Sequence, residues 1–128
     1  MTYLGIDYGS KYIGLAKSDE AGVLAFPLEV ILNNSKALDA ILVICKNKRV
    51  HTIIIGDSVD QFGVQNKITE KITEFVNNLK KNTGLEIKYE KEGFTSSHAR
   101  HGGSEQKGRI DASAAALILQ RFLDRSSK

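Results

Sequence analysis

The sequence has little of what marks secreted, membrane or thiolate-metal proteins. Its single cysteine, Cys45, lies in an apolar segment, which excludes an intrachain disulfide and argues against a cysteine-based metal site. No apolar run approaches the roughly 18 to 20 residues that a bilayer requires, and residues 1–10 have neither a basic leader nor a small-residue cleavage site. We therefore expect a soluble, cytoplasmic protein without a membrane partner, with Cys45 in its core.

A strong charge of one sign is also absent. The 18 basic and 15 acidic residues give a net charge of +3, too small a bias to indicate a nucleic-acid partner by itself. The bias is local, because residues 98–109 (HARHGGSEQKGR) hold three cations and only one acid among several glycines. This basic, glycine-rich loop is a candidate phosphate-binding segment.

Length and apolar content bound the architecture. The 128 residues fit one compact domain, which we assign to residues 1–128, and they exclude a two-domain enzyme. An apolar content of 41% is enough to bury a sizeable core. Any chemistry that the chain performs is therefore expected to be built on a single core.

Hydrophobic patterns predict strands that alternate with helices. The predicted strands are one ending at Asp7, one at residues 12–16 after a turn, and others at residues 24–32, 51–56 and 85–90. The predicted helices follow residues 33–35, cover residues 68–82 and begin at Asp111. Three strands followed by alternating helices and strands indicate an α/β fold with a mixed sheet of about five strands.

Local signals add detail to this prediction. The only proline, Pro27, predicts that the strand at residues 24–32 lies at an edge or begins there, because proline lacks a backbone N–H. The polar residues 33–35 are expected to cap a helix whose buried stripe is formed by Leu38, Ile41, Leu42 and Cys45. The unbroken β-branched run at residues 51–56 predicts the central strand, buried on both faces.

Asp7 is the first candidate for chemistry. It closes the first predicted strand two residues before Gly9, so its carboxylate would project beside a backbone that can approach a phosphate closely. Asp7 could equally initiate the turn, as aspartate often does. An acidic residue in this position recurs in ribonuclease H-like nucleases and in actin-like ATPases and sugar kinases. The second group binds nucleotide between two such domains, and this chain has room for one.

Several short motifs then stand in a recognisable order along the chain. They are Asp7-Tyr8-Gly9-Ser10-Lys11, Ile13-Gly14-Leu15-Ala16, Glu92 with Phe94-Thr95-Ser96, and Lys107 with residues 110–124. This order closely resembles the bacterial YqgF family, whose members are described as Holliday-junction-resolvase-like proteins and as nucleases that mature the 5′ end of precursor 16S ribosomal RNA. The resemblance implies a ribonuclease H-like fold.

The resemblance also implies a site of three acidic residues, Asp7, Glu92 and Asp111. Hydrolysis of a phosphodiester must activate water and stabilise charge on the attacking and leaving oxygens, which two Mg²⁺ or Mn²⁺ ions about 3.5–4 Å apart can do. Magnesium takes hard oxygen ligands such as carboxylates. The three carboxylates, which are distant in sequence, would therefore have to converge in the fold.

Two of these acids have simpler interpretations. Asp111 directly precedes a helix-forming run and could act only as an N-cap, an interaction worth typically ~1 kcal/mol. Glu92 lies in the run EKEG, where a solvated charge is the default interpretation.

The chain departs from the family pattern in two places. Lys91 and Gly93 flank Glu92 where the family usually has an acidic residue and an arginine, so an arginine expected to bind phosphate is missing. Gly56-Asp57-Ser58 replaces the usual glycine, leucine and proline. Because some ribonuclease H-like enzymes place a metal ligand at the end of this strand, Asp57 is a further candidate ligand.

Four cations are candidates for phosphate contacts: Lys11, Arg100, Lys107 and Arg109. Neutralising phosphates gives sequence-independent affinity that falls with salt. For Lys11, scattered surface charge is an equally simple interpretation. His98 and His101 are three residues apart, but no further cysteine or histidine lies near them in the sequence, so we do not expect a zinc site.

The resemblance, taken with these features, implies a cytoplasmic, divalent-metal-dependent endonuclease that acts on structured RNA, with precursor 16S ribosomal RNA as the expected substrate. Two alternatives stay open. One is cleavage of branched DNA, which would need a dimer to cut symmetric strands. The other is a catalytically weak nucleic-acid-binding protein on the same scaffold, which the missing arginine would explain. For the assembly we expect a monomer or a weak homodimer.

Overall fold

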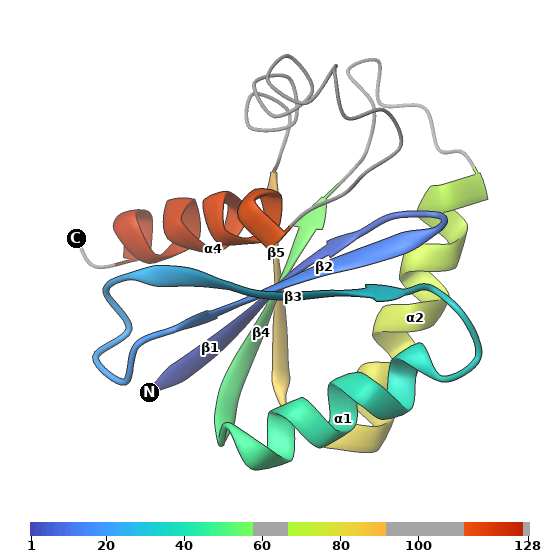
Figure 1. Cartoon of the computed structure of the whole chain (residues 1–128), viewed down its shortest axis with the longest axis horizontal. Coiled ribbons are helices and arrows are strands. Elements are labelled where there is room, and N and C mark those ends of the chain that lie inside the picture. The colour runs from blue at the N-terminus through green and yellow to red at the C-terminus, as the bar shows by residue number, and fades with distance from the viewer. Residues whose placement is uncertain (58–66, 92–111, 127–128) are drawn as a thin grey trace.

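A five-stranded mixed sheet organises the chain. The computed structural model describes residues 1–57, 67–91 and 112–126 (Figure 1). The strands are β1 (Thr2–Tyr8), β2 (Tyr12–Ser18), β3 (Ala25–Leu32), β4 (Val50–Asp57) and β5 (Glu86–Lys91), and the helices are α1 (Ala37–Asn47), α2 (Lys67–Thr83) and α4 (Ala112–Ser126). The strand order is β3-β2-β1-β4-β5. The predicted α/β class with a five-stranded mixed sheet is confirmed.

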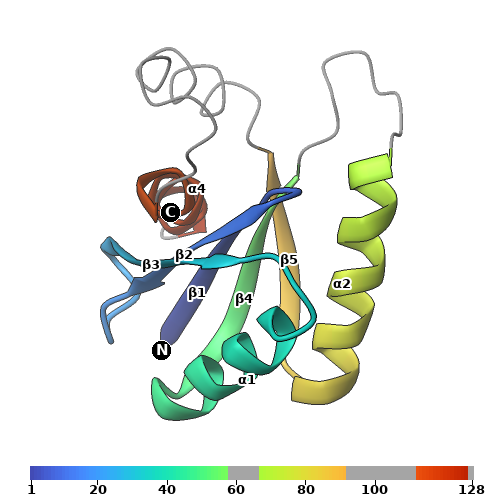
Figure 2. The ribbon, with the colours of Figure 1, turned by 45° about the vertical axis from the view of Figure 1, so that its right-hand side comes forward.

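The helices cover both faces of the sheet. Figure 2 shows α4 on one side of the strands and α1 and α2 on the other. Alternate residues of β1 supply the two resulting cores, since Leu4 and Ile6 belong to the core under α1 and α2, whereas Tyr3 packs on the core under α4. None of the described helices is long and apolar enough to cross a bilayer.

The first two strands form the predicted hairpin. They pair antiparallel, and the turn closes with the Gly9 N–H donating to the Tyr12 carbonyl oxygen at 3.0 Å. β4 pairs parallel with β1 and with β5. The carboxyl ends of these three parallel strands therefore meet at one edge of the sheet.

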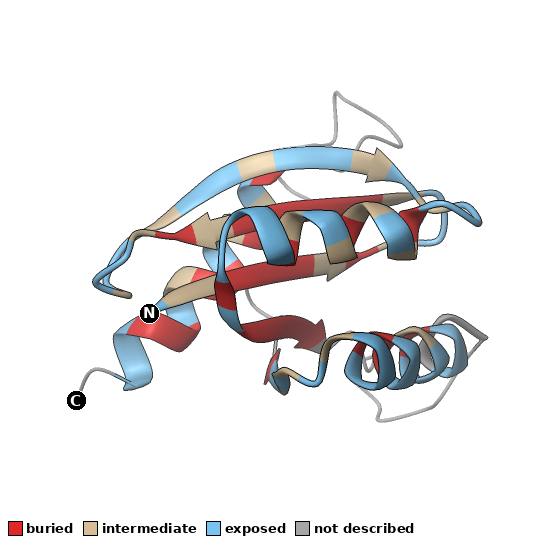
Figure 3. Cartoon of the chain, turned by 90° about the horizontal axis from the view of Figure 1, so that it is seen from below, coloured by how far each residue is buried: buried red, intermediate tan, exposed pale blue. Residues whose placement is uncertain are grey.

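The run at residues 51–56 is not the central strand, although it is buried as predicted. β4 lies between β1 and β5, so the middle of the sheet is β1. In β4 the residues from Thr52 to Gly56 are buried, and Figure 3 shows the buried residues concentrated on the inner strands. A strand is buried on both faces when helices cover both sides of the sheet at its position. β4 meets this condition although it is next to the edge strand and not in the middle of the sheet.

The cap of α1 also differs from the prediction. The N-cap residue is Lys36, which makes no side-chain capping hydrogen bond. Asn34, two residues before the N-cap, accepts the hydrogen bonds at this end of the helix. Its Oδ1 accepts from the Lys36 N–H at 2.9 Å, and its carbonyl oxygen accepts from the Ala37 N–H at 3.1 Å. The fully buried stripe is Ala37, Ile41 and Cys45, while the predicted Leu38 and Leu42 are only partly buried.

Cys45 belongs to the core, as expected. Its side chain is 7% exposed, and burial raises the pKa of its thiol to about 11. A thiol with such a pKa is almost wholly protonated at neutral pH, so it packs as a small apolar group.

The edge position of β3 is confirmed, and α4 protects its first residues. Pro27 lies in β3, which pairs only with β2. Gln120 of α4 reaches the start of this strand, where its Oε1 accepts from the Ala25 N–H and its Nε2 donates to the Val23 carbonyl oxygen, both at 2.9 Å. The side-chain amide of Gln120 thus hydrogen-bonds two backbone groups at the edge of the sheet.

Gly5 allows α4 to lie directly on β1. A Cβ atom built on Gly5 would lie 2.8 Å from the Cβ of Leu119 and 3.0 Å from the carbonyl oxygen of Ala115. The first distance is shorter than real Cβ contacts, and the second atom is helix backbone, which cannot rotate away. The absence of a side chain at Gly5 therefore sets how closely the helix approaches the sheet.

Gly5→Ala tests this contact. We expect the free energy of unfolding to fall by about 1–3 kcal/mol, because overpacking forces the helix away from the strand. Urea denaturation measures the loss, and chemical shifts of Ala115 and Leu119 report the displacement. Gly84→Ala is the control for steric contact, since nothing lies within 4 Å of its added Cβ. Any loss of stability in that variant comes from the backbone φ of +69° and not from packing. Unchanged stability in Gly5→Ala would contradict the contact.

Candidate nuclease site

The candidate site lies at the edge where β1, β4 and β5 end. The register pairs Ile6 of β1 with Ile55 of β4, and Asp57 of β4 with Lys91 of β5, so the three strand ends lie side by side. In Figures 1 and 2 the ends of β4 and β5 point to the same side of the molecule. Asp7 follows Ile6 directly, so it lies at this edge.

Asp7 faces the side of the sheet that α4 covers. It is half-buried, and it alternates along β1 with Ile6 so that it shares a face with Tyr3 and Gly5. Tyr3 packs against Phe122 with ring centroids 5.8 Å apart, whereas Gly5 meets Ala115 and Leu119. Residues of β1 closer to Asp7 therefore contact residues of α4 closer to the N-terminus of that helix.

Five of the predicted site residues lie outside the described residues. They are Glu92, Arg100, Lys107, Arg109 and Asp111. Of these, Glu92 directly follows the end of β5 at Lys91, and Asp111 directly precedes the start of α4 at Ala112. The predicted convergence of the three carboxylates stays a prediction.

Asp57 is the last residue of β4, at the strand end where sequence analysis expected it. Its role as a metal ligand stays a prediction. Among the side chains that the structure describes, which do not include that of Asp57, no group of three from histidine, cysteine, aspartate and glutamate is placed to hold a metal ion.

Lys11 lies in the turn between β1 and β2, at the same edge as Asp7. Its side chain is exposed, and its Nζ lies 5.7 Å from the centroid of the Tyr12 ring, within the range of a cation–π contact. Its carbonyl oxygen accepts from the Asn33 N–H at 2.9 Å, which ties the turn to the end of β3. The backbone of this cation is thus held beside the candidate site.

Glu90 is a charged residue of this region that sequence analysis missed. It is 1% exposed, and its two carboxylate oxygens accept from the two terminal nitrogens of Arg125, with Nη1 to Oε2 at 2.9 Å. The Nε of Arg121 lies 3.8 Å from Oε2. The ion pair joins β5 to α4, the two elements that adjoin Glu92 and Asp111 in sequence. Arg121 and Arg125 are four residues apart and share a helix face, but this spacing does not identify Glu90 as their partner.

Arg125→Ala should destabilise the fold. The buried Glu90 carboxylate would lose its paired donors, and we expect the free energy of unfolding to fall by about 1–3 kcal/mol. Urea denaturation at neutral pH measures the loss. Arg121→Ala is the matched control, and the longer distance of Arg121 from the carboxylate predicts a smaller loss. Equal losses in the two variants would show that the paired geometry of Arg125 is unimportant.

Solved structures with low sequence identity share this fold. Residues across 99% of the chain superpose on 96% of Thermus thermophilus RuvC in complex with a Holliday junction substrate, with a TM-score of 0.63 and 15% identity. The Fowlpox virus resolvase in complex with substrate Holliday junction DNA matches over 100% of both chains, with a TM-score of 0.64 and 10% identity. These likenesses confirm the predicted ribonuclease H-like fold.

Relatives in sequence match nearly the whole chain. A protein of Sulfurihydrogenibium sp. (strain YO3AOP1) named "Putative pre-16S rRNA nuclease" is 40% identical, over 97% of this chain and 90% of its own length. Proteins of the same name from Fusobacterium nucleatum and Clostridium botulinum are 33% and 34% identical, with coverage of 95% or more on both sides. Residues 1–125 match the RuvX family, described as Holliday junction resolvase. This match and these relatives confirm the resemblance to YqgF proteins and show that the chain belongs to the RuvX family.

Proposed function

We propose that this protein is a cytoplasmic, divalent-metal-dependent endonuclease that processes the 5′ end of precursor 16S ribosomal RNA. The observation that carries the proposal is the position of Asp7. It lies at the carboxyl edge of the parallel strands, on the face of the sheet under α4 and toward the start of that helix. The names of the near-full-length relatives supply the reaction and the substrate.

Asp7, Glu92 and Asp111 are proposed to hold two Mg²⁺ or Mn²⁺ ions, with Asp57 as a further ligand. The donor set fits these ions, because all four side chains offer hard carboxylate oxygens. Bound there, the ions would supply Lewis-acid stabilisation of the phosphate oxygens and lower the pKa of water. The half-buried position of Asp7 would hold its carboxylate in a fixed direction on the sheet.

Lys11, Arg100, Lys107 and Arg109 are proposed to bind backbone phosphates. Lys11 supports this proposal because it is exposed at the same edge as Asp7. Contacts of this kind position the nucleic acid without reading its sequence. Binding should accordingly weaken as the salt concentration rises.

Two other functions are favoured by particular observations. The solved RuvC and Fowlpox structures hold Holliday junction DNA, which favours branched DNA as the substrate and would require a homodimer for symmetric cuts. Lys91 and Gly93 stand where the family usually has an acidic residue and an arginine, which favours a protein that binds nucleic acid and cleaves it weakly. Cleavage and binding assays on the same variants distinguish the three functions.

Asp7→Asn should abolish cleavage and retain binding. Loss of one carboxylate removes a metal ligand, and we expect the rate to fall by at least roughly 10²-fold, the scale of losing one electrostatic group at a transition state. The assay uses labelled precursor 16S RNA and, in parallel, a four-way DNA junction, with Mg²⁺, Mn²⁺ or EDTA. Asp39→Asn, in the first turn of α1, is the control and should leave the rate unchanged. Binding without cleavage by the wild type under every metal condition would favour the weakly active alternative.

Asp57→Asn separates the proposed further ligand from the other three. If Asp57 holds metal, the variant should need a higher Mn²⁺ concentration for half-maximal cleavage, by roughly 10-fold or more, as found when a metal site loses a supporting group. Isothermal titration with Mn²⁺ measures the affinity independently of turnover. Unchanged affinity and unchanged cleavage would remove Asp57 from the site.

A further inference from the structure

A partly exposed apolar strip lies beside Asp7 on the same face of the sheet. Tyr12 begins β2 and is half-buried, and it is paired directly with Leu32 of β3. Leu32 is 54% exposed, and Val30, two residues before it, is 36% exposed. The strip of Tyr12, Val30 and Leu32 is therefore available to a molecule bound at this edge.

The sheet register places this strip next to the candidate site. Asp7 is paired with Gly14, and Tyr12 lies two residues from Gly14 along β2. Side chains two residues apart on a strand share a face, so Tyr12 is a diagonal cross-strand neighbour of Asp7. The Cα atoms of such neighbours are typically about 7–8 Å apart. Val30 is paired with Gly14 itself. One molecule could therefore contact the carboxylate and the strip together.

The chemistry of the strip suits a nucleobase. A phosphate or a ribose hydroxyl gains little from an aromatic ring beside a leucine, whereas a base presents an apolar π-face that stacks on such a ring. Lys11 adds a cation 5.7 Å from the centroid of the Tyr12 ring, where it could meet the phosphate of the same nucleotide.

We infer that Tyr12, supported by Leu32, stacks on a base of the nucleic-acid strand bound at the Asp7 site, and that this base is unpaired. The inference rests on the proposed function and narrows its substrate class. In a duplex the faces of the bases are covered by their neighbours, so only a single-stranded or splayed nucleotide can offer one. The scissile region is accordingly single-stranded, even where the rest of the RNA is folded.

The test compares binding of two RNAs in EDTA, which removes the divalent metal that the proposed cleavage requires. The probes are a fluorescein-labelled twelve-nucleotide RNA of mixed, G- and C-containing sequence and its blunt duplex with the complementary strand, each measured by fluorescence anisotropy at low salt and below the melting temperature of the duplex. Tyr12→Ala should weaken binding of the single strand roughly fivefold or more and binding of the duplex by less than about twofold. Tyr12→Phe keeps the ring and should bind both probes as the wild type does.

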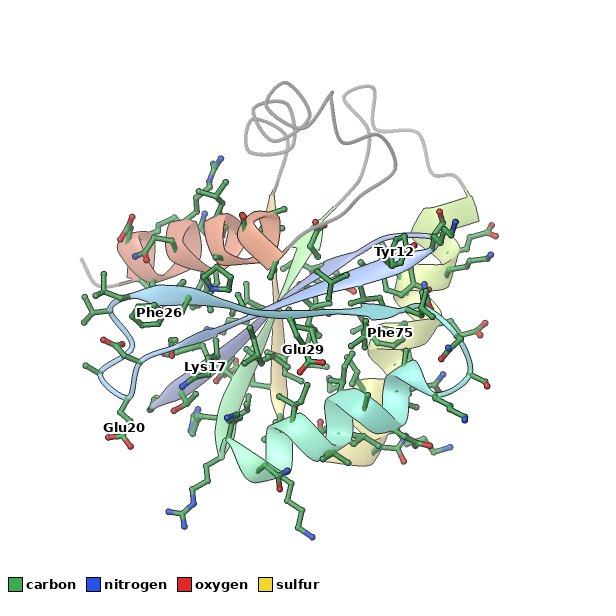
Figure 4. The ribbon with its side chains drawn as sticks, in the orientation of Figure 1. Tyr12, Lys17, Glu20, Phe26, Glu29 and Phe75 are labelled. Atoms are coloured by element: carbon green, nitrogen blue, oxygen red, sulfur yellow. The ribbon has the colours of Figure 1, made fainter. Side chains whose placement is uncertain are left out.

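Phe26→Ala is the matched control. Phe26 is another partly exposed aromatic residue of the same sheet, 46% exposed, and it is paired with Lys17 near the other end of β2. Figure 4 shows Tyr12 and Phe26 at opposite ends of the sheet. Its substitution should leave binding of both RNAs unchanged.

Two further variants cover the case in which Tyr12→Ala fails to fold. Tyr12→Leu keeps an apolar side chain without a π-face, and Leu32→Ser removes the apolar neighbour from an exposed position. Both should weaken binding of the single strand selectively. Equal losses on both RNAs, no loss on either, or a Tyr12→Phe variant as weak as Tyr12→Leu would overturn the inference.

The outcomes also separate this inference from the proposed nuclease activity. Selective loss of single-strand binding together with no cleavage under any metal condition would retain the stacking role of Tyr12 and reject the nuclease. Metal-dependent cleavage, together with RNA binding that substitutions at Tyr12 do not change, would retain the nuclease and reject the stacking role of Tyr12. A wild type that binds neither probe would overturn the stacking role, while the cleavage assay would still judge the nuclease.

Discussion

The close contact between Gly5 and α4 governs the arrangement of the candidate site. Ala115 and Leu119 lie directly on the strand because position 5 has no side chain. α4 begins one turn before this contact, and Asp7 lies two residues beyond it along β1. The depth at which the helix rests on the sheet therefore sets the separation between the end of β1, where Asp7 lies, and the start of α4 at Ala112.

Much of this fold could be predicted from the sequence because its signals are local. The β-branched run of β4, the glycine turn after Asp7 and the proline of β3 each restrict the backbone by themselves. The place of β4 in the sheet was predicted wrongly, since burial of a strand depends on what covers it and not on its rank in the sheet. The predicted cap of α1 was also wrong, because the three successive polar residues 33–35 offer several equivalent hydrogen-bonding arrangements.

The site was less predictable than the fold. Asp7 could be found because strand, acid and glycine adjoin in the sequence. Glu90 could not, because a buried carboxylate reads like any solvated one until its partner is known, and Arg125 lies 35 residues away. In the segment that runs from Glu90 through Lys91 to Glu92, the first acid is committed to holding β5 against α4. Charge alternation in the sequence does not show that Glu90 has this structural role.

The edge strand has a consequence for how copies of this protein behave at high concentration. β3 is eight residues long and exposes several apolar side chains, which is the profile of a strand that recruits others and nucleates aggregates. Gln120 occupies the N–H of Ala25 and the carbonyl of Val23, and Pro27 has no N–H to offer. A second strand approaching the beginning of β3 would find these three backbone groups already taken or missing. Self-association by extension of the sheet is thereby discouraged at this end, without any burial of the apolar side chains themselves.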